Sequence, residues 1–188
     1  MIGCGSTDHA GFGGYVDTHA HLDDPAFDAD RAEVLAAARA VGVRRLLNIG
    51  YCPARWPTTV ALARSEVNIS FTLGLHPGHA DEDSPETFET LARLVHEERP
   101  VAIGEIGLDY SRPEPAPRRQ RDLFRRQLEL AANLALPVVV HQRAAAEDCA
   151  DILSDAPDSQ VVILHCFEGD ERLLRLGSER GWLFAIGG

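Results

Sequence analysis

Histidines recur in this sequence where short apolar runs end. These runs are rich in Val, Ile and Leu and are predicted to be strands, and Glu105 ends the fourth of them. Five of the eight histidines lie at or just past the end of such a run: His19, His21, His76, His141 and His165. The carboxyl ends of parallel strands meet on one face, so these side chains are expected to converge. A single histidine at a strand end is usually structural, but the joint pattern predicts a metal centre.

These residue types define the chemistry that such a centre could perform. Neutral imidazoles and carboxylates suit Zn²⁺, Mn²⁺ or Fe. Side chains two residues apart on a strand face the same way, so His19 and His21 could chelate one ion together. A central Glu can bridge two ions ~3.5–4 Å apart, and such a site lowers the pKa of bound water towards ~7 for attack on phosphorus or a carbonyl carbon. The G-x-S-x-G motif of serine hydrolases is absent.

The elements that must position these residues alternate in type along the chain. The predicted strands are Tyr15–His19, Arg44–Gly50, Ile69–Leu75, Val101–Glu105, Pro137–His141, Val161–His165 and Trp182–Ile186. The predicted helices are Asp30–Val41, Trp56–Glu66, Pro85–Glu98, Pro117–Leu134, Ala144–Ser154 and Asp170–Arg180. Ser84 is expected to cap the third helix, which has Pro85 at its first position. The longest irregular segment is expected at 106–116.

Alternating strands and helices are typical of either a (βα) barrel or an open doubly wound sheet. A nucleotide-binding sheet needs a glycine-rich loop after its first strand, but that position reads DTHAHLDDP. We therefore predict an α/β fold of the TIM-type (βα)8 barrel class. Eight units usually take ~250 residues, so residues 15–188 are expected to form a barrel domain that lacks its last strand and helix. Residues 1–14 are expected to be a flexible tail, and the outer strands are expected to keep open, apolar edges.

Composition narrows the class of protein and its setting. The net charge of −11 argues against broad electrostatic binding of nucleic acid, although local metal could neutralise a charged substrate. The four cysteines are scattered without a C-x-x-C pair, which favours a reducing compartment. No apolar run reaches the ~20 residues of a membrane helix. We expect a cytoplasmic protein that does not enter a membrane.

Five motifs in order resemble the TatD family of metal-dependent, deoxyribonuclease-like hydrolases, within the amidohydrolase-like barrels. They are VDTHAHLDDPAFDADR from Val16, GLHP from Gly74, AIGEIGLDY from Ala102, PVVVHQRAA from Pro137 and VILHCFEG from Val162. H-x-H alone is a weak signal, but this order and spacing is specific and runs from Val16 to the last residue. The resemblance implies the TIM-type barrel and hydrolysis of ester bonds.

The resemblance also implies a ligand set for two divalent ions, Zn²⁺, Mg²⁺ or Mn²⁺. One ion would be held by His19 and His21, the other by His141 and His165, and Glu105 would bridge them. The family places a further metal-binding and catalytic aspartate on the eighth strand, in a motif like E-T-D-x-P that does not occur in these 188 residues. Glu105 and Arg143 are therefore the catalytic candidates in this chain.

Several neighbours are expected to support this centre. Arg143 would bind a substrate phosphate, because guanidinium matches its geometry. His76 is expected to orient substrate or water, with a structural role as the alternative, and Asp109 could orient a ligand histidine. Cys166 is expected to pack in the interior rather than bind metal. Two departures from the family pattern stand at Ala144, usually acidic, and Glu168, usually Ser or Thr.

The function predicted from the resemblance is a TatD-type hydrolase, a DNase or phosphodiesterase that acts on DNA or another phosphodiester. One alternative is a metal-dependent amidohydrolase or deacylase on a non-nucleic substrate, which the acidic charge favours. Another phosphoesterase class that opens with H-x-H is disfavoured because no Ser-Asp-Gly follows His21. A truncated, inactive remnant is the non-enzymatic alternative, and the oligomeric state stays open.

Overall fold

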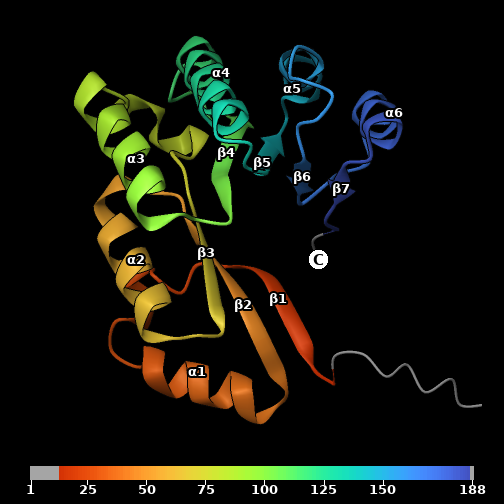
Figure 1. Cartoon of the computed structure of the whole chain (residues 1–188). Coiled ribbons are helices and arrows are strands. Elements are labelled where there is room, and N and C mark those ends of the chain that lie inside the picture. Colours follow the sequence, from red (N-terminus) through yellow and green to blue (C-terminus); the bar gives the residue numbers. More distant parts are fainter. Residues whose placement is uncertain (1–12, 187–188) are drawn as a thin grey trace, which may run out of the picture.

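The computed structural model describes residues 13–186 and contains one parallel sheet whose strands follow one another in chain order (Figure 1). The strands are β1 (Tyr15–Ala20), β2 (Val43–Gly50), β3 (Ile69–Leu73), β4 (Ala102–Asp109), β5 (Val138–Arg143), β6 (Val162–His165) and β7 (Leu183–Phe184). The sheet curls, and the helices lie outside it. The prediction of an α/β barrel-type fold with seven of its strands is confirmed.

Each connection between strands contains an α-helix. The helices are α1 (Arg31–Ala40), α2 (Trp56–Ser65), α3 (Pro85–Glu98), α4 (Pro117–Asn133), α5 (Ala146–Ser154) and α6 (Glu171–Arg180). Three 3-10 turns lie at strand ends: η1 (Pro25–Phe27), η2 (Pro53–Arg55) and η3 (Pro77–Glu82). The expected cap of α3 is confirmed, because the Ser84 hydroxyl accepts a hydrogen bond from the Thr87 amide at 3.1 Å.

Strand β4 is longer than predicted and changes the irregular segment that follows it. The sequence predicts a strand that ends at Glu105, but pairing with β5 continues to Asp109, opposite Arg143. Gly107 allows this continuation: its φ is +124°, and a Cβ there would lie 2.1 Å from the His141 carbonyl oxygen. The expected irregular segment 106–116 therefore begins four residues later, after Asp109.

The core lies between the sheet and its outer helices. Its largest cluster includes Trp56, Ile103, Phe124 and Leu164, and a smaller one gathers around Leu35 and Leu46. Most buried residues are apolar side chains of the strands and of the helix faces that cover them.

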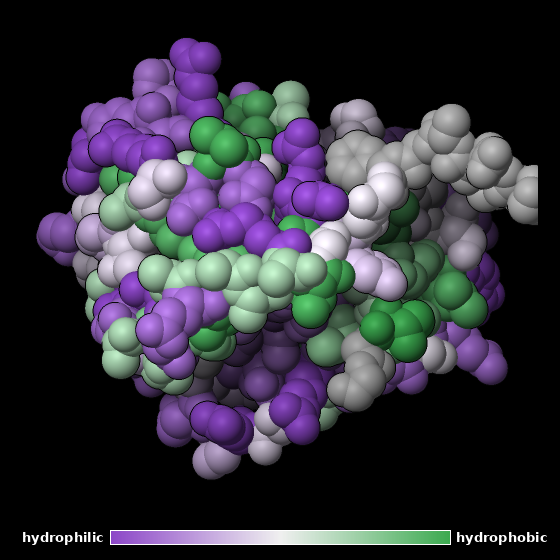
Figure 2. Space-filling view, turned by 90° about the horizontal axis from the view of Figure 1, so that it is seen from below, coloured by the Kyte–Doolittle hydropathy of each residue, from purple (hydrophilic) through white to green (hydrophobic). Residues whose placement is uncertain are grey.

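The outer strands β1 and β7 each pair with one neighbour within residues 13–186. Large apolar side chains are exposed on both: Tyr15 is 70% exposed, Val16 51% and Leu183 59%. On the face seen from below, Figure 2 shows separate hydrophobic patches among hydrophilic residues. The expected open, apolar edges are thus present in the described part of the chain.

The predicted tail of residues 1–14 falls almost wholly outside the described residues, so its flexibility stays a prediction. None of the described helices is long and apolar enough to cross a membrane.

Candidate metal centre

The Glu105 carboxylate lies at the centre of the predicted ligand set, with each oxygen facing a different pair of rings. Oε2 lies 3.5 Å from Nε2 of His19 and 4.0 Å from Nε2 of His21. Oε1 lies 3.0 Å from Nδ1 of His141 and 3.9 Å from Nε2 of His165. Four strands therefore bring all five predicted residues together, and Glu105 is almost fully buried among them.

The first pair of histidines directs one ring nitrogen each towards Glu105. His21 Nδ1 lies 3.2 Å from the Ile49 carbonyl, which can only accept, so in the neutral ring Nδ1 carries the proton and Nε2 has the lone pair. His19 Nε2 is buried and has no hydrogen-bond partner. An unpaired buried nitrogen beside a carboxylate fits a cation, because it would otherwise bear the cost of desolvation. The residues present therefore fit a divalent metal ion.

His141 is held between two carboxylates, one on each side of its ring. Its Nδ1 faces Glu105, and its Nε2 lies 3.3 Å from Oδ2 of Asp109. Asp109 is itself fixed, because its Oδ1 accepts hydrogen bonds from the Ser111 amide and hydroxyl. The two acids raise the pKa of His141 against the opposing effect of burial. This geometry matches the expected role of Asp109, which was to orient a ligand histidine.

The charge of Glu105 is set by its neighbours. Burial is the largest single effect and raises its pKa, but the hydrogen bond with His141 and the nearby His19 ring outweigh it. The pKa of Glu105 therefore lies below its ordinary value, and the carboxylate is ionised. A buried anion surrounded by imidazoles is the electrostatic arrangement that a cation completes.

His165 and His76 occupy different positions at this mouth. The His165 ring stacks on that of His19 at 3.5 Å between centroids, and burial lowers its pKa to about 4. Potential ligand atoms within 4.8 Å of one another form the sets His19–His21–Glu105 and His76–Glu105–His141. The compact second set thus contains His76 in place of the predicted His165, which lies slightly further away.

The hydrogen bonding of His76 nevertheless favours contact with substrate rather than metal. Its Nδ1 accepts a hydrogen bond from the Gly78 amide at 2.9 Å, so in the neutral ring the proton is on Nε2. That nitrogen can donate to an oxygen but has no lone pair for an ion. Burial lowers the pKa of His76 to about 4, which keeps the ring neutral.

Two buried glutamines of α4 fix the strand ends that carry these residues. Gln127 bonds both backbone groups of Leu75, at 2.8 Å to the amide and 3.0 Å to the carbonyl. Gln120 bonds both backbone groups of Asp109 in the same way, at 2.8 and 2.9 Å. Sequence reasoning missed both, because two glutamines seven positions apart on a helix resemble an ordinary polar face. They explain how one helix holds His76 and Asp109 in place.

Other neighbours are placed as follows. Arg143 ends β5 and is exposed, and its guanidinium has no hydrogen bond or ion pair within residues 13–186, so it is available to an anion. Asp23 is fully buried, and its carboxylate accepts a hydrogen bond from the Asn48 side chain.

The prediction that Cys166 packs in the interior is wrong: it is exposed, and its sulfur lies 3.2 Å from His165 Nε2. A left-handed φ of 48° turns Cys166 out of the strand path.

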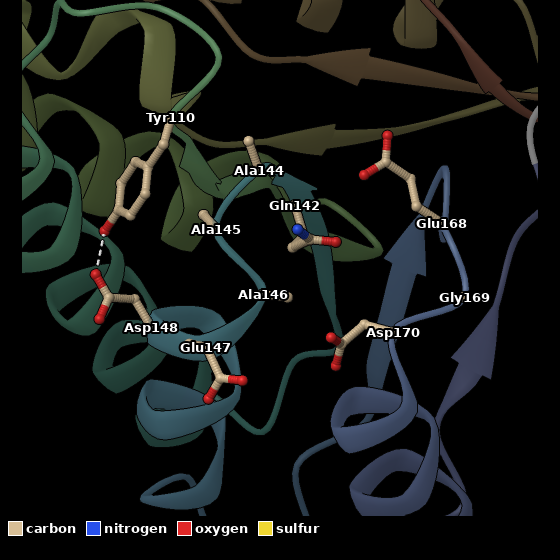
Figure 3. A pocket seen from close by; sticks show the side chains of 10 residues that line it. All are labelled: Tyr110, Gln142, Ala144, Ala145, Ala146, Glu147, Asp148, Glu168, Gly169 and Asp170. Atoms are coloured by element: carbon tan, nitrogen blue, oxygen red, sulfur yellow. Dashed lines mark hydrogen bonds between the residues drawn. The ribbon is translucent and has the colours of Figure 1, made fainter.

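A pocket of about 700 Å³ opens beside this centre, between the starts of α5 and α6 (Figure 3). Four carboxylates line it, and no basic residue does; the acids are Glu147, Asp148, Glu168 and Asp170. Gln142 lines its inner wall and follows His141 in the strand, so the two side chains point to opposite faces of the sheet. The pocket is therefore close to the ligand cluster in sequence but lies on the other side of β5.

Comparison with known proteins identifies the family of this chain. The TatD related DNase family matches residues 16–188. The "3'-5' ssDNA/RNA exonuclease TatD" of Erwinia amylovora is 40% identical over 155 residues, which cover 81% of this chain and 60% of that protein. The "uncharacterized metal-dependent hydrolase YabD" of Bacillus subtilis is 32% identical, with 92% of this chain and 68% of that protein covered.

The solved structures include the TatD homologue YJJV of Escherichia coli K12, which superposes with a TM-score of 0.82 at 31% identity. That alignment covers 90% of this chain and 66% of the homologue. This chain thus spans about two thirds of the length of the relatives that it matches. A family match over nearly all of the chain, together with a relative at 40% identity, is sufficient: the chain belongs to the TatD-related DNase family.

Proposed function

We propose that this chain carries the ligands for two divalent metal ions and belongs to an enzyme that hydrolyses phosphodiesters in DNA or RNA. The main observation behind this proposal is the position of the Glu105 carboxylate. One of its oxygens faces His19 and His21, and the other faces His141 and His165. A carboxylate shared in this way is the bridge that a two-metal site requires. The names of the relatives supply the substrate class.

When bound, such ions supply Lewis acidity and activate water for attack on phosphorus. The side chains of the chain itself would hold and orient the reactants. His76 would donate from Nε2 to a substrate oxygen, and the exposed Arg143 would pair with a phosphate. Asp109 would keep the His141 ring in register. Glu105 and Arg143 remain the catalytic candidates, and a cytoplasmic setting remains our expectation.

A metal-dependent amidohydrolase or deacylase is the second candidate. The acidic net charge and the four carboxylates of the pocket beside β5 favour it, because they repel a polyanion. The third hypothesis is that the chain is an inactive remnant of such an enzyme.

Metal analysis combined with activity assays on several substrates distinguishes these functions. Metal content is measured after loading with Zn²⁺, Mn²⁺ or Mg²⁺, and end-labelled single-stranded DNA and RNA, a phosphodiester and an N-acyl amide are offered to each form. We expect about two ions at the Glu105 centre and metal-dependent cleavage of the nucleic acids from their 3' ends. Cleavage of the amide alone would favour the second candidate, and absence of bound metal under all loading conditions would refute the proposal.

A further inference from the structure

Outside the Glu105 cluster, a second group of metal-binding side chains comes together from two connecting segments. Cys52 lies between β2 and η2, whereas His79 and Glu82 belong to η3. One ligand atom from each lies within 4.8 Å of the other two. The His79 Nδ1 and the Glu82 Oε1 are 2.5 Å apart. None of the three is among the residues expected to bind the two ions.

Glu82 differs from the two acids on either side of it in the sequence. Asp81 pairs with Arg119, and Asp83 pairs with Arg126 at 2.7 Å, so α4 neutralises both. Glu82 instead turns to His79, and none of the ion pairs found within residues 13–186 joins it to an arginine. Arg55, three residues after Cys52 in the chain, points to Asp28 and to the Asp23 carbonyl. In the described part of the chain, the group therefore has a carboxylate and a thiol but no identified basic partner other than His79.

Cys52 is poorly suited to act as a nucleophile at this position. The sulfur is half-buried, and burial raises the pKa of the thiol, with the backbone amides of Ala54 and Arg55 acting in the opposite direction. A nucleophilic cysteine needs a lowered pKa and a base that takes its proton. A cation would supply the missing positive charge directly at the sulfur.

We propose that Cys52, His79 and Glu82 form a third metal site, selective for Zn²⁺, with water as the fourth ligand. Thiolate, imidazole and carboxylate together suit a borderline-soft ion, whereas Mg²⁺ demands oxygen ligands. Binding replaces the S–H bond of Cys52 with an S–Zn bond and releases one proton to solvent. The ion would join the β2–α2 and β3–α3 connections, which supply its ligands.

The position of the site gives it access to the mouth of the main centre. The Tyr51 ring lies 4.7 Å from that of His21 and 5.7 Å from that of His79, between the two clusters. A cation beside His79 would therefore stand behind Tyr51, at the edge of the surface where a phosphodiester would arrive. The site does not depend on the proposed function, because it shares no ligand with the Glu105 cluster.

Cobalt(II) titration in excess Mg²⁺ tests the site, because a Co–thiolate bond gives a charge-transfer absorption that imidazole and carboxylate do not. The wild type is compared with Cys52→Ser and with the matched control Cys166→Ser, whose sulfur lies beside His165. Glu105→Gln reports on any contribution of the main centre. We expect the band in the wild type, in Cys166→Ser and in Glu105→Gln, and its loss in Cys52→Ser. Zn²⁺ should displace the cobalt.

Two further readouts keep the test decisive. Zn²⁺ should raise the melting temperature of Glu105→Gln but not that of the double variant with Cys52→Ser. His79→Gln and Glu82→Gln should each weaken Zn²⁺ binding by more than ~10-fold, since losing a direct ligand costs at least as much as losing an outer partner. They also carry the test if Cys52→Ser does not fold. A band that is absent from the wild type, or that survives Cys52→Ser and disappears in Cys166→Ser, would overturn the proposal.

Discussion

At the scale of single residues, Glu105 is distinctive because its two carboxylate oxygens face different histidines. Its oxygens face His19 and His21 on one side and His141 and His165 on the other. Each histidine, by contrast, offers one nitrogen to one side of the carboxylate. Removing a histidine therefore affects one half of the centre, whereas removing Glu105 affects both.

Glu105→Ala should accordingly lose both ions. We expect metal content after dialysis to fall by about two ions per chain, the two held at the Glu105 centre, and hydrolysis to fall by at least about 10³-fold. Elemental analysis and rate measurements check this. Glu89→Ala, which removes an exposed carboxylate on α3, is the matched control and should change neither quantity. Near-normal metal content in Glu105→Ala would show that the carboxylate does not bridge.

His76→Asn should separate binding of metal from turnover. The Nε2–H of His76 is a donor and its Nδ1 is already occupied by Gly78, so the ions should stay in place. Hydrolysis should fall about 10²-fold, the usual loss of one well-placed donor to a developing negative charge. A drop in metal content equal to that of Glu105→Ala would instead make His76 a ligand.

The lowered pKa of His76 also predicts how the effect of His76→Asn on the rate depends on pH. Burial lowers the pKa of His76 to about 4, so the ring stays neutral at and above about pH 6. The ratio of wild-type to His76→Asn rates should therefore be constant from about pH 6 to pH 9, and the contribution of His76 should change only as pH falls towards its pKa. A ratio that changes by more than a few-fold within that range would mean that His76 titrates there.

At the scale of elements, three segments are joined by one small polar network. Tyr110, just after β4, donates to Asp148 of α5 at 2.6 Å (Figure 3). Arg121 of α4 contacts the same carboxylate at 2.8 Å. The pKa of Asp148 lies below its ordinary value of 3.8. The hydrogen bond from Tyr110 lowers it most and the bond from Arg121 lowers it further, whereas burial acts in the opposite direction. This network ties the segment after Asp109 to two helices.

Tyr110→Phe should lower the free energy of unfolding by about 1 kcal/mol, the typical net value of one hydrogen bond. Because the folded-state pKa of Asp148 is lowered, this contribution is complete above about pH 4 and is lost as pH falls through the folded-state value. Urea unfolding at about pH 7 and pH 3 measures both. Tyr15→Phe, at an exposed ring, is the control and should have no effect at either pH. An equal loss at both pH values would contradict the assigned partner.

The sequence predicts the elements well because hydrophobic period and cap residues are local properties. The six helices and seven strands all occur, and boundaries such as that of α3 agree to the residue. The end of β4 could not be predicted, because Gly107 looks like a strand terminator and only the close approach of His141 reveals its use. The five ligand candidates converge as strand-end spacing predicts. The Cys52 group was missed because its members belong to no shared strand-end pattern.

At the scale of the whole molecule, the open edges of β1 and β7 govern how the 188-residue polypeptide behaves alone. Unpaired backbone groups beside exposed apolar side chains favour pairing with another chain. We expect this polypeptide to associate, as measured by light scattering after size exclusion. Tyr15→Lys combined with Leu183→Lys should shift it towards the monomer, whereas Val67→Lys, at a fully exposed residue away from both edges, should not. A monodisperse wild-type monomer would show that the edges are protected.

The order of the strands also affects how the sheet can fold while the chain is being synthesised. Within residues 13–186, every strand pairs only with strands adjacent to it in the chain, so each new βα unit can add to an edge that has already formed. Such a sheet can grow during synthesis, amino end first. The capacity to chelate would then be acquired in steps: His19 and His21 emerge early but wait for Glu105, and the second half is complete only once His165 has left the exit tunnel. A nascent chain of this protein would thus complete its two-ion centre late, after β1 to β5 have formed.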